Sequence, residues 1–356
     1  MALPTTAATD ISNAILSWYM KGPARAQTIQ DKPLLRILDA AKKTFPAGNL
    51  YIQGNVRGAY MESTASSSSS ATAGQEFFHG YNESEQLGFM PSANILQYRY
   101  QWYETHAGLV ITWSELKKTG VTITDRGSVS RHAGGEVAII TDLLMERYAD
   151  YAESYAREKN EMLWKDGSQD SQVPPGILSI LTDDPAVGTV GNLSRATYSW
   201  WRHRGLIGNS KITASATDQT LTKALRREMI QLRRYGGKPT RAICGSDFLE
   251  GMRLEIHEKG VYTQSGFTGT RDISMGDIRL DGLVFEYDPT LDDLGLSKRC
   301  YIIDTRAIRL MPMVGEDDKL AFPERPYDYA IFLKSLFWTG ALVCDQPNAN
   351  GIYEIA

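Results

Sequence analysis

The sequence has few cysteines, and their spacing supports neither metal binding nor a disulfide framework. Its 356 residues contain three, Cys244, Cys300 and Cys344, far apart and without a CxxC pair. An odd number without metal-ligand spacing argues against a structural zinc site and against a disulfide-stapled fold. We therefore expect the three cysteines to be reduced and to act as small buried apolar side chains, in a protein made in a reducing compartment.

Long apolar runs and an excess of positive charge are also missing. No stretch reaches the roughly 18 apolar residues that a membrane-spanning helix needs, and the first residues lack the charged start of a secretory signal. The formal net charge is −4 and the pI about 5.8, whereas proteins that mainly bind nucleic acid are usually basic. We expect a soluble, intracellular chain with no membrane partner.

Motifs for catalysis and cofactor binding are absent as well. There is no GxxxxGK[ST] or GxGxxG loop, and none of the five histidines stands at HExxH or HxE spacing. The nearest nucleophile motif, CGSDF at 244–248, lacks the second glycine of GxSxG. A strand-to-helix turn capped by Ser246 or Asp247 explains it more simply. No catalytic residue, cofactor or metal is predicted.

What the sequence does contain is a set of amphipathic helices. Helical spacing predicts one long helix over about 136–165, with a core-facing stripe of Ile140, Leu144, Tyr148, Tyr151, Tyr155 and Met162. A second helix at 219–236, ended by a glycine pair, has the stripe Leu221, Leu225, Met229 and Leu232. A short helix at 34–43 has its apolar side at Leu35, Ile37, Leu38 and Ala41. A third helix is expected after a buried strand at 241–244.

Strand patterns surround these helices. Residues 95–113 alternate, so that Tyr98, Tyr100 and Trp102 share one face and Arg99, Gln101 and Tyr103 the other. Because an isolated hairpin is marginal in water, this indicates a two-stranded projection that lies on another surface. The serine run at 63–74 predicts a flexible loop. Strands dominate after residue 270, and this order indicates an α+β fold rather than βαβ alternation.

One stretch, GTVGNLSRATYSWWRHR at 188–204, sets two adjacent tryptophans among basic side chains. It could be a nucleic-acid stacking site, a ligand pocket or a contact with another copy of the chain. Tryptophan and arginine are enriched at contact hot spots, and the acidic chain disfavours nucleic acid. We expect Trp200 and Trp201 to divide between core and contact, with Arg195, Arg202 and Arg204 bridging to acidic groups nearby or on a neighbouring copy.

Together these features resemble the major capsid proteins of tailed bacteriophages, which have the HK97 fold. The resemblance rests on order and spacing over nearly the whole chain. The residues that carry it are GILSILTDDPAVGTVGNLSRATYSWWR (176–202), LRREMIQLRRYGGKPTRAICGSDFLEGM (225–252), DGLVFEYDP (281–289), YIIDTRAIRLMPM (301–313) and LVCDQPNANGIYEI (342–355).

The resemblance implies a division of the chain into four parts. These are an N-terminal arm at 1–54, an extended loop at 55–125 that lies across an adjacent subunit, a peripheral domain at 126–179 and 299–356 with the long helix as its spine, and an axial domain at 180–298. As a hypothesis, we assign contacts between subunits to Trp18, Tyr98, Tyr100, Trp102, Trp200, Trp201, Arg202 and Arg204.

The implied function is a shell subunit. It would self-assemble as hexamers and pentamers into an icosahedral virion capsid around double-stranded DNA, held without sequence-specific binding, and assembly would take place in the host bacterial cytoplasm. Further expected partners are a separate scaffolding protein, since the arm begins almost at once, and a portal, whereas the sequence leaves open whether a decoration protein binds the shell. No covalent Lys–Asn crosslink is predicted.

Two alternatives stay open at this point. One is an encapsulin-like compartment shell that holds enzyme cargo. The other is an enzyme whose site is assembled from dispersed residues such as Ser246, Asp247 and His257.

Overall fold

The computed structural model describes residues 29–58, 82–84, 95–112, 114, 134–215, 217–263, 278–320 and 331–356, with the backbone alone at 111, 134–147, 257–263 and 332. Its helices are α2 (Pro33–Ala40), α4 (Gly134–Trp164), α5 (Ile177–Ile180), α6 (Thr220–Arg233), α7 (Ser246–Thr263) and α8 (Pro289–Asp293). Single 3₁₀ turns are η1 (Ser199–Trp201), η2 (Gly208–Ser210) and η3 (Pro347–Ala349). The strands are β1 (Ile52–Arg57), β2 (Ile95–Tyr100), β3 (Tyr103–Thr112), β4 (Thr189–Val190), β5 (Leu193–Ser194), β6 (Arg204–Leu206), β7 (Arg241–Cys244), β8 (Ile278–Leu280), β9 (Leu283–Tyr287), β10 (Arg299–Ile303), β11 (Ile308–Pro312), β12 (Lys319–Leu320), β13 (Ile331–Cys344) and β14 (Gly351–Glu354).

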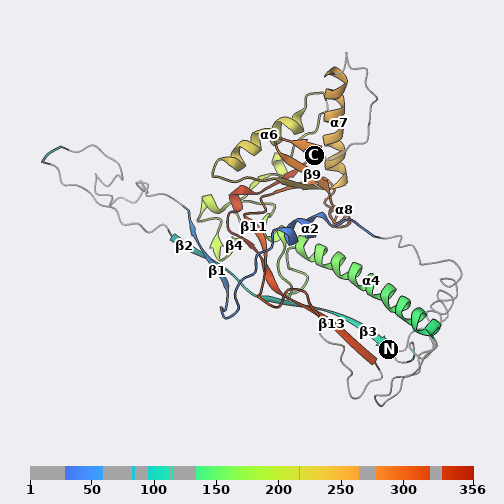
Figure 1. Ribbon diagram of the computed structural model, residues 1–356. Coiled ribbons are helices and arrows are strands. Elements are labelled where there is room, and N and C mark those ends of the chain that lie inside the picture. The colour runs from blue at the N-terminus through green and yellow to red at the C-terminus, as the bar shows by residue number, and fades with distance from the viewer. Residues whose placement is uncertain are drawn as a thin grey trace.

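A six-stranded sheet in the order β6-β14-β10-β7-β9-β8 supports α6 and α7 (Figure 1). Side chains alternate along β7, so that Ala242 and Cys244 pack with these two helices while Ile243 enters a different core cluster. The sequence-predicted stripe of α6 is confirmed. Its four residues, Leu221, Leu225, Met229 and Leu232, are at most 2% exposed.

The start of α6 is capped by a side chain from α7. The buried Glu255 carboxylate accepts hydrogen bonds from the N–H groups of Leu221 and Thr222, both at 2.8 Å, and from the Thr222 hydroxyl at 2.7 Å. The first N–H groups of a helix lack partners within the helix, and a negative charge there is favourable. Sequence reasoning missed this residue because its partner lies in another helix.

A second sheet is centred on the long strand β13, which pairs with β11 and β12 on one side and with β3 on the other. The β3–β13 pairing runs without a break from Tyr103 opposite Gly340 to Thr112 opposite Ile331. Between the two sheets lies a core cluster that also takes in α2, α5 and the end of α4. In α2 the predicted Ile37 and Leu38 are buried in this core and Leu34 joins them, while the predicted Leu35 is half-buried and packs against the same cluster.

The long helix α4 is confirmed, but its predicted core stripe is only partly right. Tyr148, Tyr151, Tyr155 and Met162 are half-buried, and the side chains of Ile140 and Leu144 lie outside the described residues. Among the side chains of α4 that the structure describes, the buried ones are Lys159, Asn160, Leu163 and Trp164. The reason is that α4 covers polar groups: the hydroxyls of Tyr151 and Tyr155 donate to the Ala107 carbonyl and to Asp318, and Lys159 pairs with Asp318 at 2.8 Å.

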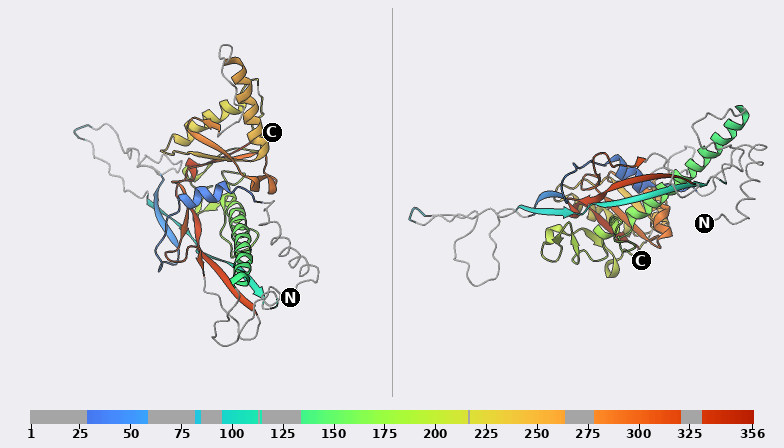
Figure 2. Two further views of the ribbon diagram at one scale, coloured as in Figure 1. Left: turned by 45° about the vertical axis from the view of Figure 1, so that its right-hand side comes forward. Right: turned by 90° about the horizontal axis from the view of Figure 1, so that it is seen from below.

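A two-stranded ribbon projects from one side of the body (Figures 1 and 2). It consists of β1 and β2, paired antiparallel from Ile52 opposite Tyr100 to Arg57 opposite Ile95. The strand pattern predicted over 95–113 forms two strands that are separated at residues 101–102, because β2 pairs with β1 whereas β3 pairs with β13. The serine run at 63–74 lies outside the described residues.

The domain boundaries implied by the resemblance stay a prediction, and the topology refines two of them. A boundary after Gly54 would divide β1, whose two halves pair with one strand. The segment 299–356 does not return as a whole to the second sheet, since β10 and β14 are inner strands of the six-stranded sheet while β11, β12 and β13 join the other.

Candidate contact site around the tryptophan pair

Trp201 belongs to the core. It is 1% exposed, and its indole N–H donates to the Val190 carbonyl at 2.9 Å. Its neighbours in the same cluster are Ile52, Tyr98, Leu193, Met311, Ala341 and Val343. The prediction that one tryptophan of the pair is a core residue fits Trp201, which offers no surface to a partner in this conformation.

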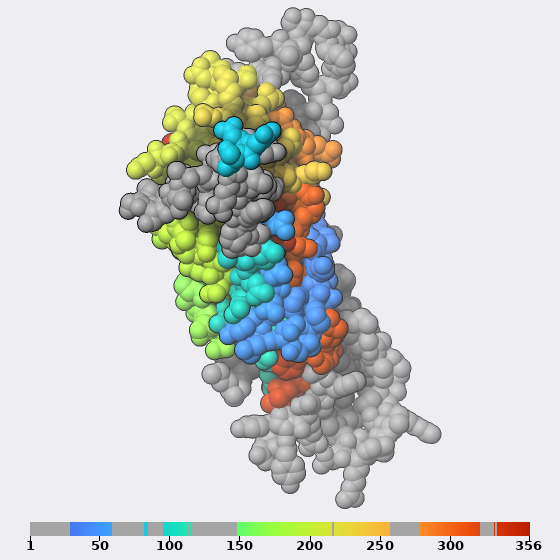
Figure 3. All heavy atoms as spheres, turned by 90° about the vertical axis from the view of Figure 1, so that its left-hand side faces the viewer, coloured from blue at the N-terminus to red at the C-terminus, as the bar shows by residue number. Residues whose placement is uncertain are grey.

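Trp200 lies at the root of the projecting ribbon. It is half-buried, and its ring packs edge-on against Trp201 with centroids 5.6 Å apart. A Cβ added to Gly58 would lie 1.9 Å from this ring, so the indole rests directly on the backbone at the end of β1. The pair therefore links the ribbon to the core, with Trp201 inside and Trp200 at the surface (Figure 3 views the side from which the ribbon leaves).

The neighbouring arginines behave differently from one another. Arg204 fulfils the prediction of an acidic partner, since its guanidinium forms two hydrogen bonds of 3.1 Å with the Glu228 carboxylate. Arg195 does not: it is fully buried and donates to the Thr182 hydroxyl and the Ile180 carbonyl. Arg202 donates to the carbonyls of Arg195 and Ala196. The prediction is wrong for Arg195, because it is fully buried among loop groups without a carboxylate. For the half-buried Arg202, an acidic partner on a neighbouring copy stays a prediction.

His203 is the one group of this stretch with a large pKa change. It is 2% exposed, and its Nε2 lies 2.9 Å from the Thr182 carbonyl oxygen, to which the neutral ring donates. Burial first, and the nearby Arg195 charge second, lower the pKa of His203 to about 4. The folded chain therefore holds this imidazole neutral.

We predict that His203 makes the fold sensitive to mild acid. Because its folded pKa is about 4 and its ordinary value 6.5, its contribution is complete above pH 6.5 and is lost as the pH falls toward 4. The unfolding free energy should drop by up to about 1.4 kcal/mol per pH unit in this window. Urea unfolding at pH 7 and pH 5 should show a smaller drop for His203→Gln than for wild type. His106→Gln on the exposed His106 is the control, and an equal drop in both variants would contradict the assignment.

The aromatic face of β2 turns toward its own chain. Tyr98 is 8% exposed, with its ring against Gly54 directly across the ribbon. The Tyr100 hydroxyl donates to the Cys344 carbonyl, and the Trp102 N–H donates to the Asn49 carbonyl, both at 2.9 Å. Assigning Tyr98 to a subunit contact was wrong because its ring fills the base of the ribbon. The assignment stays a prediction for Tyr100 and Trp102, and Trp18 lies outside the described residues.

A cavity of about 440 Å³ opens beside the pair. Its lining includes Trp200, Arg202, Arg204, Arg234 and Tyr235. The outward face of α6 continues this positive surface with five exposed cationic side chains, Lys223, Arg226, Arg227, Arg233 and Arg234. Ile230 and Tyr235 are 69% and 64% exposed on it. A basic face with exposed apolar side chains can bind an acidic protein surface, and Arg202 and Arg204 stay predicted contact residues there.

The described residues offer little for catalysis. No group of three or more His, Cys, Asp or Glu that could hold a metal occurs among them, and none of their helices has the length and apolarity to cross a membrane. The Ser246 N–H donates to Asp292, and Asp247 accepts from the Ser297 hydroxyl. Asp292 thus serves the start of α7, where we had predicted a cap by Ser246 or Asp247. The side chain of His257 is outside the described residues.

Two of the three cysteines, far apart in sequence, meet in the core. Cys244 and Cys300 lie opposite each other on β7 and β10, with their sulfurs 3.1 Å apart and both side chains fully buried. All three cysteines are free thiols. Burial raises the pKa of Cys244 and of Cys344 above the ordinary value, so these thiols are poor nucleophiles.

The sequence matches no protein-family model and no curated protein. Solved structures do match it, over nearly its whole length. The capsid asymmetric unit of cyanophage A-1(L) has a TM-score of 0.64 at 14% identity, covering 93% of this chain and 94% of that one. The capsid of Myoviridae phage XM1 gives 0.54 at 10% identity, with 94% and 95% covered.

A third similar structure is the capsid of a native GTA particle. Its TM-score is 0.53 at 14% identity, and each chain is covered completely. Identities this low establish the fold alone. The α+β, HK97-like capsid fold expected from the order of the sequence features is thereby confirmed.

Proposed function

We propose that the chain is the major subunit of a capsid shell. Copies associate as hexamers and pentamers, which close into an icosahedral container for double-stranded DNA. The observation that carries this proposal is the near-complete coverage by capsid chains, which takes in the whole architecture and not one shared domain. The solved structures come from phage and GTA capsids, which favours a DNA container over an enzyme-filled compartment.

The shape of the chain supports association with further copies. A two-stranded ribbon buries little surface of its own and is marginal in water unless another surface covers it. Leu50, just before β1, and Ile95, at the other end of the ribbon, are 77% and 60% exposed, and along the β3–β13 pair Val110 and Phe337 are 50% and 41% exposed. Exposed apolar side chains on both the ribbon and the second sheet suit a subunit that meets neighbours on several sides.

The remaining partners belong to the same proposal. The protein resides in the virion capsid after assembly in the bacterial cytoplasm, with a scaffolding protein, a portal and a decoration protein as partners. The net charge of −4 suits packaged DNA that is enclosed without sequence-specific binding. No residue cluster in the described part of the chain points to an enzymatic role.

The test is electron microscopy of the protein expressed with its neighbouring genes, after separation on a density gradient. Closed icosahedral particles or hexameric capsomers are expected, and their contents distinguish a DNA container from a cargo compartment. A stable monomer or small dimer under all conditions would overturn the proposal.

Deleting residues 63–74 is expected to leave the folded subunit intact and to weaken shells. The segment joins the two strands of the ribbon through a run rich in serine, which contributes little to a core. The free energy of unfolding of the isolated subunit should stay within about 0.5 kcal/mol of the wild-type value, while the yield of closed particles falls. A subunit that no longer folds would contradict the assignment of this run to a loop.

A further inference from the structure

Two cysteines face each other across neighbouring strands of the six-stranded sheet. Cys244 is the last residue of β7 and Cys300 the second of β10, and the register places them opposite each other. The Cys244 thiol donates to the Cys300 sulfur, with the two sulfurs 3.1 Å apart. Both side chains are fully buried in the core cluster that the sheet shares with α6 and α7. Two thiols in contact can be joined by oxidation.

The backbone at this pair suits a disulfide. The Gly245 N–H donates to the Arg299 carbonyl at 3.0 Å, so the next pair along the ladder, Cys244 and Cys300, is one without backbone hydrogen bonds between its two residues. At such pairs the Cα atoms are about 4.5 Å apart, which falls within the range of about 4.4–6.8 Å that disulfides span. The sulfurs can therefore approach to the bonded distance of about 2.0 Å without separation of the strands.

The third cysteine has a different neighbourhood. Cys344 is also fully buried, but it ends β13, lies in the other core cluster, and stands opposite Ile308. The fold thus selects Cys244 and Cys300 from the three pairings that the sequence allows.

A bond between the two sulfurs would close a large ring. The cysteines are 56 positions apart in the chain, and residues 245–299 between them include α7, β8, β9 and α8. Joining the ends of so long a loop removes much of the freedom of the unfolded chain, so the bond should stabilise the folded segment.

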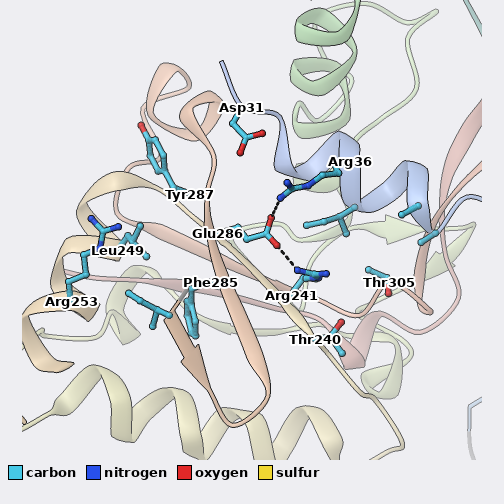
Figure 4. A pocket seen from close by; sticks show the side chains of 14 residues that line it. Asp31, Arg36, Thr240, Arg241, Leu249, Arg253, Phe285, Glu286, Tyr287 and Thr305 are labelled. Atoms are coloured by element: carbon cyan, nitrogen blue, oxygen red, sulfur yellow. Dashed lines mark hydrogen bonds and ion pairs between the residues drawn. The ribbon is translucent and has the colours of Figure 1, made fainter. Parts of the chain in front are cut away.

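On the other side of β7 the same segment is held by charge. Figure 4 shows Glu286 of β9 between Arg241 of β7 and Arg36 of α2, and it binds each of them at 2.5 Å. These two arginines and Arg253 line a cavity of about 830 Å³. Because the arginines are partly exposed, salt weakens their ion pairs, whereas a covalent link between β7 and β10 would hold the segment at any salt concentration.

We propose that Cys244 and Cys300 are a latent disulfide, by which we mean a pair that stays reduced inside the host cell and is joined across β7 and β10 once the shell has left it. The inference rests on the proposed function in one respect, the passage of the shell from a reducing to an oxidising environment.

The oxidant is a low-molecular-weight disulfide, RSSR. One cysteine thiolate attacks it, breaks its S–S bond and forms a mixed disulfide, with release of RS⁻. The second thiolate attacks the protein sulfur of the mixed disulfide and expels the other RS⁻. Two electrons pass from the cysteines to the oxidant, and the two thiol protons end on two molecules of RSH.

The position of the pair makes this reaction slow and still accessible. Burial raises the pKa of the Cys244 thiol above the ordinary value, so little thiolate is available and the reduced chain has time to fold and assemble. The β7–β10 register ends at this pair, so fraying of the strand ends exposes it without unfolding of the whole sheet.

The experiment counts free thiols before and after oxidation. Wild-type subunits and assembled particles are kept with oxidised glutathione, unfolded in iodoacetamide, which alkylates every free thiol, and weighed by intact mass spectrometry. Reduced protein should carry three alkyl groups, one for each cysteine, and oxidised protein one, at Cys344. Cys344→Ala should carry none after oxidation, whereas Cys244→Ala and Cys300→Ala should carry two in both states.

Urea unfolding of the subunit then measures the effect of the bond. Oxidation should move the transition of wild type and of Cys344→Ala to higher urea, at low and at high salt, and a reductant should reverse the shift. Cys244→Ala is the matched control, with the same transition in the presence and absence of oxidant.

Three outcomes would overturn the proposal. They are three alkyl groups after oxidation, a lasting mixed disulfide with glutathione, and a bond that includes Cys344. A refolding experiment in a glutathione buffer removes the barrier of access. A Cys244–Cys300 bond that forms only there, and never in the folded chain, would also overturn it. None of these results changes the particles seen by electron microscopy, whereas failure of the proposed function would appear as the absence of shells.

Discussion

Replacing Trp201 by alanine is expected to lower the free energy of unfolding of the subunit by about 3–5 kcal/mol, as for other large buried aromatic residues. The indole is 1% exposed and fills the cluster that joins the ribbon, the 190s loop and the second sheet. Alanine leaves a cavity there, and it also leaves the Val190 carbonyl without its donor at 2.9 Å. The effect should appear in the isolated subunit, before any assembly.

The adjacent Trp200 provides the matched control. Because it is half-buried, Trp200→Ala should cost the subunit about 1–2 kcal/mol, while weakening shells through a looser ribbon root at Gly58. Urea unfolding measures the first quantity, and the yield of particles on a gradient measures the second. Equal losses of subunit stability in the two variants would show that Trp201 has no special place in the core.

Replacing Trp164 by alanine is expected to cost about 4–5 kcal/mol. Trp164 ends α4, is fully buried, and packs against Tyr301 with ring centroids 5.0 Å apart. Its N–H donates at 2.7 Å to Asp288, a fully buried carboxylate. Truncation therefore adds the cost of a less satisfied buried charge to the cost of the cavity.

Trp164→Phe separates these two contributions. Phenylalanine keeps most of the ring volume but has no N–H. We therefore expect Trp164→Phe to lower the free energy of unfolding by about 1.5–3 kcal/mol, which is the contribution of a hydrogen bond to a charged group. The measurement is denaturant unfolding of both variants at pH 7. If Trp164→Phe were as stable as wild type, the link between α4 and Asp288 would contribute nothing to the fold.

Most of the correct predictions came from the spacing of apolar residues within single helices and strands. The stripe of α6 and the strand at 241–244 follow from local spacing and are found in the structure. The stripe of α4 was misassigned because tyrosine is apolar along its ring and polar at its tip. Spacing cannot tell whether the ring enters a core or, as for Tyr151 and Tyr155, covers a sheet while the hydroxyl finds an acceptor.

The candidate contact site was predictable only in its residue types. Arg195 and Arg204 look alike in sequence, yet one is enclosed by loop carbonyls and the other by Glu228 from α6. The buried roles of Asp288 and Glu255 could not be predicted from the sequence, since their hydrogen-bond partners come from α4 and α6, far away in the chain. Which residues are contacts and which are core depends on these long-range neighbours.

By itself, the sequence determined the α+β order, the position of most helices, the absence of familiar catalytic motifs and the presence of a ribbon that needs a partner. These depend on composition and on local periodicity, which the chain carries wherever it folds. Only the tertiary structure decided that Trp201 and Tyr98 are core, that strands of the last 58 residues (299–356) divide between two sheets, and that three arginines share one cavity. Those facts depend on pairing between distant segments, and a one-dimensional pattern specifies a face without specifying what covers it.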